Sequence, residues 1–180
     1  ACSELGITLL EATIDNSAGV GEAARSLVAR GVDALFITGD VVVNVASEAV
    51  IGAAKSGRIP VFSVVSTNFK KGSLFDSGAD FIEVGEEVGG MAAKVLKGND
   101  IAKIPTEVSA PEKLTFNLTA LKDLKDAWKI TPEMLSRAAA VIDEGGNLKT
   151  KETSSSPQPL SSQKTKKIGL ISFAPEEGAD

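Results

Sequence analysis

Three short apolar segments constrain the fold of this chain more than any other feature. Each is closely followed or preceded by apolar residues at helical spacing. The segments are residues 7–13, 34–38 and 60–64. Apolar residues at helical spacing then run up to Gly31 after the first segment and up to Gly57 after the second. Near-continuous apolar strands separated by amphipathic helices are typical of a parallel sheet covered by helices on both faces. The sequence therefore predicts an α/β fold.

The regular alternation of predicted strands and helices changes after residue 72. A brief strand is expected near residues 73–76, followed by a long helix that ends at Gly98 and buries Val84, Val88 and Met91. Two extended segments are then expected, at residues 104–109 and 113–117. A last helix is expected from Thr131, its N-cap, through Asp143.

The remainder of the chain has a different composition. Residues 146–166 contain no aromatic residue and only two leucines, so we expect a flexible linker there. Residues 168–173 form another apolar strand, which resembles the opening strand of a further α/β unit. The linker is long enough for this strand to fold back onto the sheet.

Composition excludes several classes of function. The formal net charge of −5 and the scarcity of aromatic residues, seven Phe and one Trp, argue against a nucleic-acid partner. There is no histidine and only one cysteine, which excludes His-dependent triads, Cys/His zinc sites and an internal disulfide. No apolar run approaches the ~20 residues of a membrane helix. No cofactor or metal is predicted.

Small polar residues follow each of the three predicted strands. They are Asp15-Asn16-Ser17, Thr38-Gly39-Asp40 and Ser66-Thr67-Asn68. In an open parallel sheet, ligands bind beyond the carboxyl ends of the strands. This edge therefore suits a small polar or zwitterionic ligand.

Asp40 is the strongest candidate for contact with a ligand, since its carboxylate can accept charge-assisted hydrogen bonds from an ammonium or hydroxyl group. The alternative role is an N-cap for a helix over residues 41–56, and one Asp can perform both. Asn16 and Ser17 present the same choice between capping and ligand contact. Thr67 and Asn68 also suit an ordinary turn.

The order of the segments resembles the C-terminal part of ABC-transporter substrate-binding proteins with the type I periplasmic-binding fold, in the branch associated with tryptophan, tyrosine and other hydrophobic amino acids. The resemblance covers residues 1 to about 144 and rests on SELGITLLEATIDNS, AARSLVARGVDALFITGD, RIPVFSVVSTNFKKGSLFDSGADF, VGEEVGGMAAKVLKG, IPTEV and ITPEMLSRAAAVID. In that family two α/β lobes close on a ligand.

The resemblance implies a ligand site made by Asp40, Thr38, Ser66, Thr67, Asn16 and Ser17. It also implies that residues 1–72 belong to the second lobe, and that residues 73–145 return to the first lobe and add the C-terminal helices. The tail at 167–180 resembles the first strand and ligand loop of the same family, which implies tandem copies in the parent protein.

The leading functional hypothesis is a non-catalytic receptor for an amino-acid-like solute, working with an ABC permease in the periplasm or outside the cell. The resemblance and the start at Ala1 further suggest a lipid anchor on a missing N-terminus. Two alternatives remain open: a ligand-sensing effector domain of a regulator with the same fold, and a small α/β enzyme. No catalytic pair in the sequence supports the enzyme.

Overall fold

The chain forms one eight-stranded sheet. The computed structural model describes residues 2–104, 112–150 and 167–173, and for the last range only the backbone is considered. The strands are β1 Thr8–Ile14, β2 Ala34–Ile37, β3 Val61–Ser63, β4 Phe75–Ala79, β5 Glu112–Asn117, β6 Ala140–Ile142, β7 Leu148–Thr150 and β8 Lys167–Phe173. Their order across the sheet is β1-β8-β2-β3-β4-β5-β6-β7. The first five strands in this order are mutually parallel, β5 is antiparallel to β4, and β7 is antiparallel to β6. The predicted α/β class, with a mostly parallel sheet, is confirmed.

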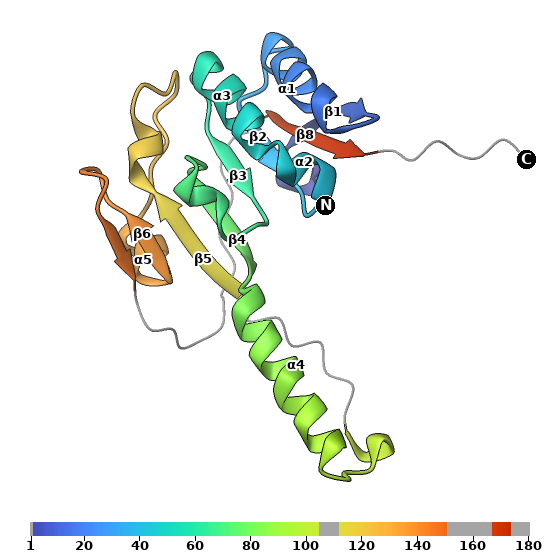
Figure 1. Cartoon of the computed structure of the whole chain (residues 1–180). Coiled ribbons are helices and arrows are strands. Elements are labelled where there is room, and N and C mark those ends of the chain that lie inside the picture. The colour runs from blue at the N-terminus through green and yellow to red at the C-terminus, as the bar shows by residue number, and fades with distance from the viewer. Residues whose placement is uncertain (1, 105–111, 151–166, 174–180) are drawn as a thin grey trace, which may run out of the picture.

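Two helices make the main core with this sheet. The α-helices are α1 Val20–Ala29, α2 Val41–Val45, α3 Ser47–Gly57, α4 Phe81–Leu96 and α5 Pro132–Ser136. Helices α1 and α3 lie side by side over the strands (Figure 1), and their apolar faces meet the inner side chains of β1 and β2. Leu27 of α1, Val50 of α3 and Leu35 of β2 are fully buried there. Burying a side chain of this size contributes about 1.5–3 kcal/mol to folding.

An aromatic row lies on the other face of the sheet. Because side chains alternate along a strand, Phe62 points away from the core that holds its neighbour Val61. Phe62 pairs in register with Phe75, and Phe75 with Phe116. Trp128 packs edge-on against Phe62, with ring centroids 5.4 Å apart. A segment without regular secondary structure therefore helps to cover this face, where we expected helices.

Strand β8 occupies an internal place in the sheet. All seven of its residues pair with β1, and Ile168 to Ile171 pair with β2 on the other side. In the doubly wound order 2-1-3-4-5, the second place belongs to the first strand of the unit. Here the last described strand fills that place. The expected strand at 168–173 is therefore present, and it pairs within this sheet.

Several expected elements differ in their bounds. The helix expected over residues 41–56 breaks at Ala46, which leaves the helical conformation with φ −99° and ψ 20° after the β-branched run of α2. The helix expected through Asp143 ends at Ser136, because Ala139 donates its amide hydrogen to the carbonyl oxygen of Leu114 and the chain enters β6. Residues 148–150 form β7, so the expected linker does not begin at 146. The rest of that linker, residues 151–166, lies outside the described residues.

Helix α4 projects away from the sheet (Figure 1), and none of its residues is buried. Of the residues expected to be buried on this helix, Val84 and Met91 are half-buried and Val88 is exposed among the described residues. The sheet continues through β4 to β7, so the boundary expected between residues 72 and 73 does not coincide with a break in the sheet. None of the helices in the described part of the chain is long and apolar enough to span a bilayer.

Candidate functional site

The carboxyl ends of five parallel strands meet at one edge of the sheet. These strands end at Ile14, Phe173, Ile37, Ser63 and Ala79, in that spatial order. The loops that leave β1, β2 and β3 carry all six residues expected to bind a ligand. The sheet therefore places these loops along one polar edge.

The loop after β2 is organised by its own polar groups. The amide of Val43 donates to Asp40 Oδ1 over 3.0 Å, so Asp40 is the N-cap of α2. The hydroxyl oxygen of Thr38 accepts the amide hydrogen of Asp40 over 3.5 Å. Among the described residues, no hydrogen bond to the second carboxylate oxygen of Asp40 is found. Capping therefore uses one oxygen of Asp40, which is a half-buried residue. The other oxygen can accept a hydrogen bond from another partner at this edge.

The loop after β1 is more exposed. Asn16 accepts the amide hydrogens of Ala18 and Gly19 over 3.0 and 3.3 Å and caps the 3-10 turn Ser17–Gly19. Both Asn16 and Ser17 are exposed to solvent. This turn contacts α2, so the loops after β1 and β2 are neighbours at the edge.

The loop after β3 packs against both adjoining strands. The amide of Val64 donates to the carbonyl oxygen of Ile37 over 3.1 Å. The hydroxyl of Ser66 donates to the carbonyl oxygen of Ala79 over 3.1 Å, at the end of β4. Thr67 is exposed beside it. Ser66 is therefore tied to the strand end, with its oxygen still able to accept a hydrogen bond.

A buried polar cluster supports this loop from below. Asn68, which is fully buried, donates through Nδ2 to Ser63 Oγ over 3.0 Å and to Asn44 Oδ1 over 3.1 Å. Ser63 Oγ also accepts the amide hydrogen of Val65 over 2.9 Å. Asn117 donates from β5 to the carbonyl oxygen of Phe69 over 2.7 Å. The turn expected of Asn68 is present; its side chain fixes the loop to β3 and α2, and Asn117 fixes it to β5.

Asp76 of β4 is the only fully buried carboxylate among the described residues. It accepts hydrogen bonds from the amide of Phe69 and the hydroxyl of Ser73. Burial raises the pKa of Asp76 from 3.8 to about 7, and the two hydrogen bonds oppose part of that rise. Its position inside the sheet makes it a structural group beneath the edge.

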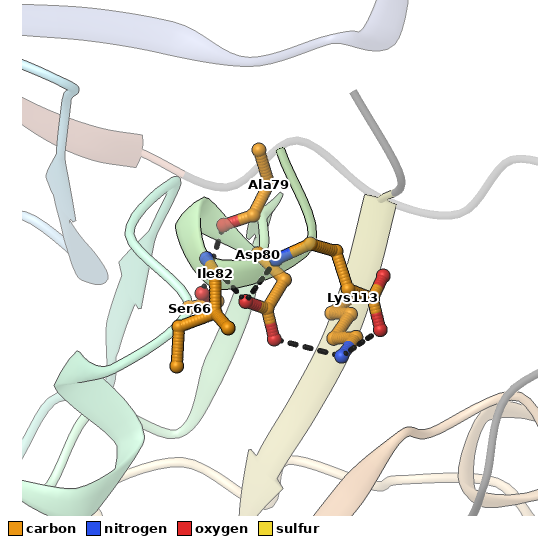
Figure 2. A network of polar contacts seen from close by, with 6 residues as sticks. Ser66, Ala79, Asp80, Ile82 and Lys113 are labelled. Atoms are coloured by element: carbon orange, nitrogen blue, oxygen red, sulfur yellow. Dashed lines mark hydrogen bonds and ion pairs between the residues drawn. The ribbon is translucent and has the colours of Figure 1, made fainter. Parts of the chain in front are cut away.

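A charged group at the end of β4 was not foreseen from the sequence. Lys113 of β5 places Nζ 2.7 Å from Asp80 Oδ2 and 2.5 Å from Glu83 Oε1 (Figure 2). The hydrogen bond from Lys113 lowers the pKa of Asp80, and the same bond raises the pKa of Lys113. An N-cap at Asp80 before a long helix was recognisable in the sequence. Its pairing with Lys113 depends on the antiparallel register of β4 and β5, which local patterns do not reveal.

Neither metal-binding side chains nor a pocket at the opposite edge of the sheet points to another centre. Within residues 2–104, 112–150 and 167–173, no group of three or more metal-binding side chains comes together. A pocket of about 350 Å³ lies at the amino end of β3, lined among others by Arg58, Pro60 and Asp123. It is at the edge opposite the six candidate residues.

Solved structures share this fold over about half of their length. A conserved domain protein from Vibrio cholerae O1 biovar El Tor matches with a TM-score of 0.67 and 27% identity, covering 78% of this chain and 46% of that protein. The ABC domain from Streptococcus pneumoniae in complex with L-Trp matches with a TM-score of 0.67 and 21% identity, covering 77% and 46%. A substrate-binding protein with adhesive properties from Clostridium difficile, in a ligand-free, open structure, matches with a TM-score of 0.54 and 27% identity, covering 73% and 44%. No curated protein matches the chain.

The fold defines an α/β unit of the periplasmic-binding type. Residues 1–142 match the family of ABC transporter substrate binding proteins, and the chain belongs to that family. The family is non-catalytic and extracytoplasmic, which excludes the small-enzyme alternative. The chain spans less than half the length of the solved structures that it matches.

Proposed function

We propose that this chain supplies one wall of the ligand site in the substrate-binding component of an ABC importer, and that the ligand is an amino acid or a similar small zwitterion. The contacts assigned to this wall come from the loops after β1, β2 and β3. They are Asn16, Ser17, Thr38, Asp40, Ser66 and Thr67. An opposing lobe of the same fold would supply the other wall.

The geometry of Asp40 carries this proposal. Its carboxylate is half-buried at the carboxyl edge, and Oδ1 is engaged in capping α2 while Oδ2 has no partner among the described residues. A carboxylate oxygen in this setting is a strong acceptor for an ammonium group. An amino acid carries such a group at one end and a carboxylate at the other.

The nature of the ligand is supported by the other loops and by one solved structure. The hydroxyls of Thr38 and Ser66 can complement the polar end of an amino acid, and the Streptococcus pneumoniae domain of the same fold holds L-Trp. The large apolar side chain of such a ligand would need a second wall to exclude water. Each polar contact facing bulk water nets only ~0.5–1.5 kcal/mol, whereas micromolar affinity requires ~8 kcal/mol.

The partner and the location follow from the family and form part of the same proposal. The receptor would deliver its ligand to the ABC permease of the importer, in the periplasm or outside the cell. A lipid anchor upstream of residue 1 and tandem copies of the unit remain proposals of this kind.

The test is the variant Asp40→Asn, which keeps an acceptor for the cap and removes the charge. It is measured by calorimetry against a panel of amino acids, in a protein that joins this chain to an opposing lobe. Affinity should fall by about tenfold or more, because a hydrogen bond to a charged group is worth ~1.5–3 kcal/mol.

The control is Asp126→Asn, which removes an exposed charge far along the chain from the edge loops. This variant should bind as the reference protein does. Residues 1–180 alone should bind weakly or not at all. Unchanged affinity in Asp40→Asn would remove Asp40 from the site, and tight binding by residues 1–180 alone would contradict the two-wall arrangement.

A further inference from the structure

Helix α4 is attached to the sheet at a single place. The chain enters the helix directly from β4 and comes back to the sheet at β5, which is paired with β4. Figure 1 shows the helix leaving this place and extending away from the sheet. Since none of its residues is buried, packing against the sheet does not set its direction. Among the described residues, the contacts that remain to set its direction are those at the attachment itself.

Three charged side chains are concentrated at this attachment. We name Asp80, Glu83 and Lys113 the hinge clasp. Asp80 is the N-cap of α4, and its Oδ1 accepts the amide hydrogens of Ile82 and Glu83 over 2.8 and 3.3 Å. Its Oδ2 faces Lys113 Nζ at 2.7 Å, and Glu83 approaches the same nitrogen at 2.5 Å (Figure 2).

The hinge clasp fixes more than an ordinary helix cap does. A cap satisfies amide hydrogens of the helix but makes no bond to a neighbouring strand. Lys113 belongs to β5, where it pairs in register with Gly78, and it holds two carboxylates of the first turn of α4. Two attachments to one helical turn restrain its rotation as well as its tilt.

The loop after β3 joins the same attachment. Ser66 donates its hydroxyl hydrogen to the carbonyl oxygen of Ala79, the residue directly before Asp80. A Cβ atom on Gly78 would clash with the backbone of Val64, so this loop and β4 are in direct backbone contact. A candidate ligand loop and the base of α4 therefore form one continuous set of contacts.

We propose that the hinge clasp is a positioning device, in which Lys113 sets the angle of α4 to the sheet and thereby the position of the far end of this helix relative to the ligand edge. Any effect of this angle on ligand binding rests on the proposed function. The positioning itself is a property of this chain and needs no ligand.

The experiment measures the direction of α4 in the full chain. Spin labels are attached to cysteines at Glu48 in α3 and Lys94 in α4, both exposed, in a Cys2→Ser background. Distances between them are measured by double electron–electron resonance. Lys113→Gln should broaden and shift the distance distribution. Salt at ~1 M, where the Debye length is about 3 Å, should change the reference protein in the same direction.

Two controls separate positioning from general loss of structure. Lys149→Gln removes an ion pair of 3.2 Å with Asp143 in the β6–β7 hairpin and should leave the distribution unchanged. The conservative variant Lys113→Arg keeps a positive charge beside Asp80 and Glu83 and should retain a distribution close to the reference. Each variant should unfold at a temperature close to that of the reference, because α4 contributes no buried residue.

An unchanged distribution in Lys113→Gln would overturn the proposal, as would an equal change in Lys113→Arg and Lys113→Gln. Because no ligand is present, these outcomes do not depend on whether an amino acid binds. Failure of the proposed function would instead appear in the calorimetry of Asp40→Asn.

Discussion

The Cα atom of Gly78 lies so close to the carbonyl oxygen of Val64 that a Cβ atom at residue 78 would be 1.9 Å from that oxygen. Val64 begins the loop that carries Ser66 and Thr67, and Gly78 lies near the end of β4. Only glycine permits this approach of two backbones. The position of a candidate ligand loop therefore depends on the absence of one side chain in a neighbouring strand.

We expect Gly78→Ala to lower the free energy of unfolding by more than ~2 kcal/mol, because neither backbone can move without breaking its pairing in the sheet. Urea unfolding measures this change. The matched control is Gly85→Ala in α4, where, apart from the neighbouring residues and the backbone of the helix itself, no described atom lies within 4 Å of the added methyl group. That variant should be neutral or stabilise the helix by up to ~1 kcal/mol. Equal effects of the two substitutions would contradict the close approach.

Asp76 should make stability depend on pH. Its pKa is raised from 3.8 to about 7 in the folded chain, so the folded state holds a proton that the unfolded state releases. The contribution of Asp76 to the free energy of unfolding is therefore greatest below about pH 4. It falls as the pH rises towards 7, by at most ~1.4 kcal/mol per pH unit.

The variant Asp76→Asn imitates the protonated carboxyl group and should remove this dependence. Urea unfolding of both proteins at several pH values measures the difference, which should favour the variant increasingly with rising pH. Asp143→Asn is a control of opposite sign, since the pKa of Asp143 is lowered, chiefly by the amide of Asn147. A constant difference between Asp76→Asn and the reference would show that Asp76 is ionised throughout.

The cap at Asp40 can be separated from its proposed ligand contact. Asp40→Ala removes the acceptor for the amide of Val43 and should lower the free energy of unfolding by ~1 kcal/mol, whereas Asp40→Asn should cost little. Urea unfolding without ligand compares the two, with Asp126→Ala as a control for loss of an exposed charge. If the two Asp40 variants were equally stable, capping by Asp40 would contribute nothing measurable.

The place of β8 can be tested by cross-linking. Ala12 of β1 pairs in register with Ile171, and neighbouring strands are ~4.8 Å apart, within the range that a disulfide can span. In a Cys2→Ser background, cysteines at residues 12 and 171 should form a disulfide under mild oxidation. Cysteines at 12 and 170 should not, because residue 170 pairs in register with Glu11 and not with Ala12. Mass spectrometry identifies the linked peptides, and equal yields from both pairs would contradict the register.

The sequence was most informative where structure depends on local pattern. The apolar segment at 34–38 predicted β2, and Asp40 after it predicted a helix cap. The polar residues after the segment at 60–64 predicted the turn at Asn68. These features depend on residues that are close in sequence. The break at Ala46 was missed, because the apolar spacing continues through it and only the backbone angles reveal the change.

The features that the sequence did not predict depend on pairing between segments that are distant in sequence. The bond between Lys113 and Asp80 requires the register of β4 against β5, and the burial of Asp76 requires the same two strands. The apolar pattern of residues 168–173 predicted a strand but contained no information about its neighbours. Its insertion between β1 and β2 follows from the vacant place in the sheet.

That insertion has a consequence for the time course of folding. The ribosome makes β1 and β2 before the strand that lies between them, which is the last described strand of the sequence. Until then both strands have an unpaired edge, a feature that promotes aggregation of incomplete chains. Contacts between residues so distant in sequence also form slowly. The moment at which the nascent sheet can close is thus set by the synthesis of residues 167–173.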